Sequence, residues 1–154
     1  MKRRTFLQAG AAALGSPLVA PSIVQAQGKR VLTFVPQADI AVLDPVWTTT
    51  YQTRDHGFLV FDTLFGLDAA YNPQPQMAAG ASSDKDGAVW TITLRDGLKF
   101  HDGEPVLARD AAASIRRWGA RDGFGQALLA ATDAIDAPDD KTIVIRLKHP
   151  FPLL

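Results

Sequence analysis

Apolar and polar residues alternate over two stretches of this chain, residues 89–95 and 142–148. In each stretch every second side chain is apolar, as a strand with one buried face requires. The apolar positions are Trp90, Ile92 and Leu94 in the first stretch, and Ile143, Ile145 and Leu147 in the second. We therefore expect two strands that share a core, with Trp90 packing against Ile145 or its neighbours.

Apolar residues recur with a helical period of three and four in other parts of the chain. This pattern predicts helices over residues 51–65 and 108–119, and a short apolar helix over residues 124–132. The stripe of the first helix consists of Phe58, Phe61, Leu64 and Phe65, and that of the second of Ala108, Ala111, Ala112, Ile115 and Trp118. Both stripes are expected in the core. Arg116 and Arg117 are expected on a solvated helix face.

Shorter segments complete the expected order of elements. Residues 30–36 are rich in β-forming side chains and predict the first strand of the folded domain. Extended segments are expected over residues 77–81 and 134–137. Turns are expected at Asp96-Gly97 and Asp102-Gly103, because glycine adopts a positive φ without a steric clash.

The length, cysteine content and net charge of the chain exclude some classes of function. The chain has 154 residues, which suits one ordinary domain, and it has no cysteine for disulfide or thiolate chemistry. Its formal net charge is zero, but the first 26 residues hold three basic and no acidic side chains, so the remainder carries −3. A mildly acidic domain is poorly suited to bind nucleic acid, which requires a basic surface.

The amino-terminal residues 1–26 have the organisation of an export signal. Lys2, Arg3 and Arg4 precede an apolar run rich in alanine and glycine, and small residues end at Ala26, where a signal peptidase would cut. The order Arg-Arg-x-Phe-Leu resembles a twin-arginine signal, and the alternative is an ordinary secretory signal in which the arginine pair occurs by chance. We therefore expect a periplasmic protein whose mature domain covers residues 27–154.

One contiguous motif carries a family resemblance. The run Thr-Ile-Thr-Leu-Arg-Asp-Gly-Leu-Lys-Phe-His-Asp-Gly-Glu-Pro, residues 91–105, is followed by Ala-Arg-Asp at 108–110. It resembles the signature of the extracytoplasmic solute-binding proteins of peptide- and nickel-type ABC transporters, family 5. The resemblance extends over residues 30–154. One departure from the family is Leu107, where a capping Ser or Thr is usual before the helix.

This resemblance implies an α/β fold of the periplasmic-binding-protein type II class. The chain would be an amino-terminal lobe fragment with a small mixed sheet flanked by helices, because family members are several times longer. The Leu-Asp-Pro run at residues 43–45 would then lie near the ligand cleft. Aromatic and hydroxyl side chains in the loop that follows suit ligand stacking and hydrogen bonding. The candidate ligand-binding residues are Trp47, Thr48, Thr49, Tyr51 and Arg54. The alternative is that Trp47 and Tyr51 only pack onto the domain.

The implied function is capture of a peptide-like solute and its delivery to the permease of an ABC importer. No chemical conversion, cofactor or metal is implied. The protein would contact the membrane only through the permease. An exported enzyme and a sensor or interaction domain on the same fold are the alternatives. The signature is shared by binders of peptides, nickel, sugars and opines, so it leaves the solute open.

Overall fold

The computed structural model describes residues 31–152. Residues 31–35 and the residues from Pro36 onward belong to two separate units, and each is considered by itself. Within residues 31–152, none of the helices has the length and apolar character needed to cross a bilayer. The expected export signal, residues 1–26, lies outside the described residues.

The strand expected over residues 30–36 is not formed in the part of it that the structure describes. Residues 31–36 have no regular secondary structure, and the side chains of Leu32 and Val35 are 93% and 82% exposed. A strand needs a hydrogen-bonded neighbour, which the composition of a segment does not supply. β-forming composition alone therefore gave a wrong prediction here.

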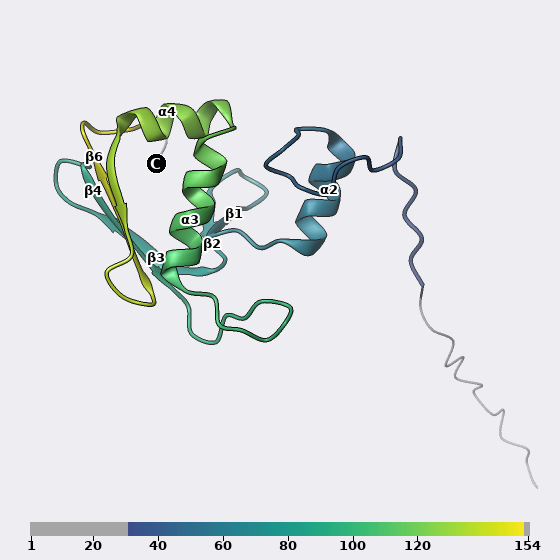
Figure 1. The fold of residues 1–154 in the computed structure, drawn as a ribbon, viewed down its shortest axis with the longest axis horizontal. Coiled ribbons are helices and arrows are strands. Elements are labelled where there is room, and N and C mark those ends of the chain that lie inside the picture. The colour runs from purple at the N-terminus through teal and green to yellow at the C-terminus, as the bar shows by residue number, and fades with distance from the viewer. Residues whose placement is uncertain (1–30, 153–154) are drawn as a thin grey trace, which may run out of the picture. The chain divides into compact units, whose positions relative to one another are not determined.

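The second unit is organised around a four-stranded sheet in the order β3-β4-β6-β5. The strands are β3 (Ala78–Ser83), β4 (Val89–Leu94), β5 (Thr132–Asp136) and β6 (Thr142–Leu147), and Figure 1 shows them beside α3 and α4. All three pairings are antiparallel, so the expectation of a mixed sheet was wrong. Short hairpin loops join β3 to β4 and β5 to β6, and such loops permit only antiparallel neighbours.

The register of β4 and β6 confirms the alternating pattern of the sequence. Trp90 lies opposite Ile145, as predicted, and Ile92 lies opposite Ile143. Ile143 and Ile145 are the largest fully buried apolar side chains among the described residues, whereas Trp90 is half-buried at the edge of the core. The buried set is Ala78, Ile92, Leu94, Ala108, Ala112, Leu128, Ile135, Ile143, Ile145 and Leu147.

Two helices, α3 (Ala108–Gly119) and α4 (Gly123–Ala131), supply the other side of this core. The predicted bounds of α3 are confirmed. Leu107 is its N-cap and offers no side-chain acceptor, but its own N–H donates to Asp110 Oδ2 at 2.9 Å. In contrast, α4 has a complete cap, because Asp122 Oδ1 accepts from the N–H groups of Phe124 at 2.9 Å and Gly125 at 3.1 Å.

The helix expected over residues 51–65 is shorter in the structure. Helix α2 (Tyr51–Val60) ends before Phe61, whose backbone is extended, and its expected stripe is exposed at Phe58 (73%) and Phe61 (50%). Leu64 and Phe65 do pack against the core, but from outside a helix. The backbone oxygen of Leu64 accepts from the N–H groups of Gln76 and Ala78, which holds this segment outside a helix. Phe65 then begins β1 (Phe65–Leu67), which pairs with β2 (Pro73–Pro75).

Candidate functional site

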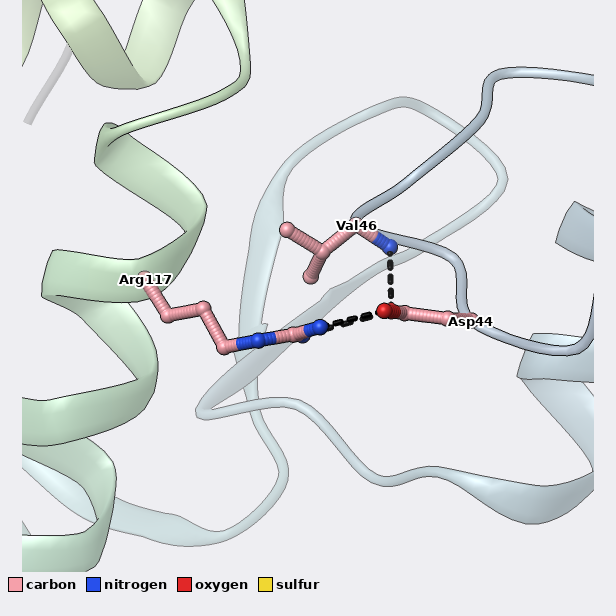
Figure 2. A network of polar contacts seen from close by, with 3 residues as sticks. All are labelled: Asp44, Val46 and Arg117. Atoms are coloured by element: carbon pink, nitrogen blue, oxygen red, sulfur yellow. Dashed lines mark hydrogen bonds and ion pairs between the residues drawn. The ribbon is translucent and has the colours of Figure 1, made fainter.

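The loop after Asp44 is held in a fixed turn by the Asp44 side chain. Asp44 Oδ1 accepts from the N–H of Val46 at 3.0 Å, and the N–H of Trp47 donates to the Asp44 backbone oxygen at 3.1 Å. The guanidinium of Arg117 on α3 pairs with the same carboxylate through two nitrogens, one of them 3.2 Å from Oδ1 (Figure 2). This two-point contact ties the loop to α3 with a defined orientation.

The opposite side of the same loop rests on α2. Thr53 is 1% exposed, and its hydroxyl donates to the backbone oxygen of Val42 at 2.5 Å. Gly57 is buried one turn later, and a Cβ there would lie 3.4 Å from Pro45 Cβ. The buried face of α2 is therefore made of small residues that allow the loop to pack closely. This explains why an apolar stripe did not identify the buried face.

The Asp44–Arg117 pair shifts the pKa values of both groups. The hydrogen bond from Arg117 lowers the pKa of Asp44 most, and the N–H of Val46 lowers it further. The same contact raises the pKa of Arg117. The pair is charged at neutral pH. Folding lowers the pKa of Asp44, so the charged carboxylate stabilises the folded chain at pH values above the pKa that Asp44 has in the unfolded chain. This stability is lost as the pH falls through the pKa that Asp44 has in the folded chain.

This linkage gives the first testable prediction. On acid titration, the Val46 amide signal in a nitrogen–proton NMR spectrum should move with a midpoint below about 3.9, the ordinary pKa of an aspartate side chain. The reason is that protonation of Asp44 removes its negative charge and thereby weakens the hydrogen bond that its Oδ1 accepts from the N–H of Val46. Asp44→Asn is the control and should abolish the step. A midpoint at or above the ordinary value would mean that Arg117 does not pair with Asp44 in solution.

Between the loop and the end of α3 lies a cavity of about 320 Å³, which we call the Trp47 hollow. It is lined by Pro45, Val46, Trp47, Thr48, Thr49, Trp118, Arg121 and Asp122. The Arg121 guanidinium carbon lies 3.8 Å from the centroid of the Trp47 ring, a close cation–π contact. The hydroxyl oxygen of Thr48 accepts from the N–H of Thr50 at 3.3 Å, which leaves its proton available to a ligand.

The structure brings together three of the five residues proposed from the sequence. Trp47, Thr48 and Thr49 line the hollow. Tyr51 and Arg54 are not among its lining residues, and they contact each other on α2, with the guanidinium carbon 4.5 Å from the tyrosine centroid. The role of all five in ligand binding remains a proposal.

Sequence reasoning missed the wall that α3 and its C-terminal end contribute. Trp118 was assigned to the core, where it does pack, but it also lines the hollow. Arg117 was assigned to a solvated face, whereas it pairs with Asp44. Arg121 and Asp122 had no motif around them, and only their nearness to Trp47 in the fold identifies them. Within the described part of the chain, no group of three or more histidine or acidic side chains could hold a metal ion.

The chain is similar to a known family of bacterial binding proteins. The family model described as bacterial extracellular solute-binding proteins, family 5 Middle, matches residues 72–154. The probable peptide ABC transporter periplasmic-binding protein y4tO of Sinorhizobium fredii is 40% identical over 98% of this chain and 29% of its own length. The probable D,D-dipeptide-binding periplasmic protein DdpA of Escherichia coli is 33% identical over 80% of this chain and 25% of its own.

Among solved structures, the binding protein MoaA of A. tumefaciens R10, in complex with mannopinic acid, aligns with a TM-score of 0.65 and 28% identity. The alignment covers 74% of this chain and 24% of that protein. The likeness supports the expected periplasmic-binding-protein fold. The chain spans about a quarter of the length of the relatives it matches.

Proposed function

The chain belongs to family 5 of the bacterial extracellular solute-binding proteins, and from this premise we propose that it contributes to the capture of a peptide-like solute for an ABC importer. The observation that carries the proposal is the 40% identity to y4tO over nearly the whole chain. The partner would be a membrane permease, which receives the solute unchanged. Family 5 consists of solute-binding proteins, and the proposal therefore assigns no catalysis to the chain.

The Trp47 hollow supports a binding role. A tryptophan, two threonines and one arginine line a single cavity, and their side chains offer both an aromatic ring and hydrogen-bonding groups to a small ligand. The Asp44–Arg117 pair and the Thr53–Val42 hydrogen bond hold the loop before any ligand arrives. Such preorganisation lowers the entropy lost on binding.

The affinity of residues 27–154 alone provides the second prediction. This segment should bind di- and tripeptides no more tightly than micromolar, because its hollow covers only one side of a ligand. A micromolar complex requires about 8 kcal/mol, and each stacking contact supplies only about 1 kcal/mol. Calorimetric titration with a peptide library is the measurement. A tighter one-to-one complex would show that the segment holds a self-sufficient site.

We propose, from the 29% coverage of y4tO, that this chain is the amino-terminal part of a longer binding protein, and the matching test of the proposed function uses that longer protein. That protein should bind at least one peptide of the same library with micromolar or tighter affinity. Failure of every di- and tripeptide to bind would contradict the assignment of a peptide-like solute.

Export through the twin-arginine route is the third prediction. We propose that residues 1–26 are a cleaved signal and that the mature protein is periplasmic, a location that the names of y4tO and DdpA state for those relatives. Replacing Arg3 and Arg4 with lysine should leave the uncleaved precursor in the cytoplasm, because this route reads the arginine pair. Cell fractionation and mass spectrometry of the amino terminus are the measurements. Normal maturation of the double variant would exclude this route.

A further inference from the structure

The charged residues around the Trp47 hollow differ in whether each has a partner. Asp44 is paired with Arg117. Asp122 uses its Oδ1 to cap α4, where the positive end of the helix dipole offsets its charge. Arg121 also lines the hollow, and among the described residues no carboxylate lies within 4.0 Å of its guanidinium. Arg121 is therefore a charged residue of the hollow that has no ion-pair partner among the described residues.

The contact with Trp47 fixes how this arginine is presented. A guanidinium stacks on an aromatic ring through its flat face, so its N–H groups, which lie in the plane, stay available. With the guanidinium carbon 3.8 Å from the ring centroid, Trp47 restricts the side chain without occupying those donors. A planar fork of donors held in this way matches a carboxylate, which accepts two parallel hydrogen bonds.

We propose that Arg121 is the anion-binding group of this site and that the ligand it takes carries a carboxylate, as the free C-terminus of a short peptide does. The proposal rests on the proposed function in that it names the chemistry of the captured solute. Trp47 is the positioning residue for Arg121, and the free hydroxyl proton of Thr48 provides a neutral donor in the same cavity. The ligand carboxylate supplies the opposite charge that Arg121 lacks among the described residues.

The experiment uses the full 154-residue chain and two matched peptides, trialanine and its C-terminal amide, titrated at millimolar concentration by NMR. The acid should bind about tenfold more tightly than the amide, as expected for one bidentate charge-assisted contact that water still reaches. In Arg121→Gln this preference should disappear, and in Arg121→Lys it should be reduced, because lysine keeps the charge but loses the planar fork. Arg109→Gln, at the exposed start of α3, is the control and should keep the full preference.

A second measurement separates this inference from the proposed function. Sodium acetate should shift the Arg121 Nε–H signal in a saturable way, and sodium chloride at the same ionic strength should not. If acetate shifts this signal while neither peptide binds, the carboxylate site stands, and the peptide-like solute is decided by the longer protein in the matching test above. Equal binding of acid and amide to the unmodified chain, an acid preference that survives Arg121→Gln, or no saturable response to acetate would each overturn the inference.

Discussion

Ile143→Ala is expected to lower the free energy of unfolding by about 3–4 kcal/mol, within the range of about 2–5 kcal/mol for isoleucine deleted from a core. Ile143 is 0% exposed, and it lies on β6 between β4 and β5, opposite Ile92. Because β6 is a central strand, the residues around Ile143 have little freedom to move into the space that its side chain vacates. Small domains are stabilised by only about 5–15 kcal/mol, so this loss is a large share of the total.

Urea unfolding followed by circular dichroism measures the effect. Two variants serve as controls for the position. Ile143→Val should cost about 1 kcal/mol, because it removes one methylene group. Val144→Ala removes two methyl carbons from the half-buried opposite face of the same strand, and it should cost less than Ile143→Ala. If Val144→Ala were the more destabilising, the inward and outward faces of β6 would be exchanged.

The sequence predicted strands β4 and β6 and helix α3 well because their signals are short-range. Alternation along β4 and β6 depends only on which face of a strand is buried, and the same residues that alternate are those that pack. The bounds of α3 follow from a stripe that recurs within a single helix. In both elements, the local pattern and the tertiary contacts favour the same structure.

The predictions that were wrong concern segments where distant contacts decide the structure. Leu64 and Phe65 continue a helical stripe in the sequence, yet hydrogen bonds from the N–H groups of Gln76 and Ala78 to the backbone oxygen of Leu64 hold this segment outside a helix. The segment 31–36 has strand-forming residues but no regular secondary structure. Helical periodicity and β-forming composition record what a segment can form, whereas the partner decides what it does form.

The candidate site depends on such distant contacts even more strongly. Asp44 and Arg117 are 73 residues apart in the chain, and no spacing rule connects them. The aromatic and hydroxyl residues of the loop could be selected from their chemistry, which identified Trp47, Thr48 and Thr49. Arg121 could not be selected in this way, because an isolated arginine after a helix is usually a solvated charge. Its stacking on Trp47 becomes visible only when α3 and the loop are placed together.

The end of α3 is fixed in turn by an unusually close approach of α4, which leads to the last prediction. Gly125→Ala is expected to lower the free energy of unfolding by about 2 kcal/mol. A Cβ at Gly125 would lie 2.7 Å from the Cα of Gly119 and 3.0 Å from Cδ2 of Trp118. The first of these atoms is backbone and cannot rotate away. Overpacking of this kind costs up to about 3 kcal/mol, and the better helix propensity of alanine returns about 1 kcal/mol.

Gly123→Ala in the first turn of α4 is the matched control, because a Cβ there would meet nothing within 4 Å. It should be neutral or slightly stabilising, since only the helix propensity changes. Urea unfolding of both variants gives the comparison, and equal stability would mean that the two helices are farther apart in solution. The strain at Gly125 should also reach the Trp47 hollow, because the ring that must move belongs to Trp118, one of its lining residues. Gly125→Ala should therefore shift the Arg121 Nε–H signal, and Gly123→Ala should leave it in place.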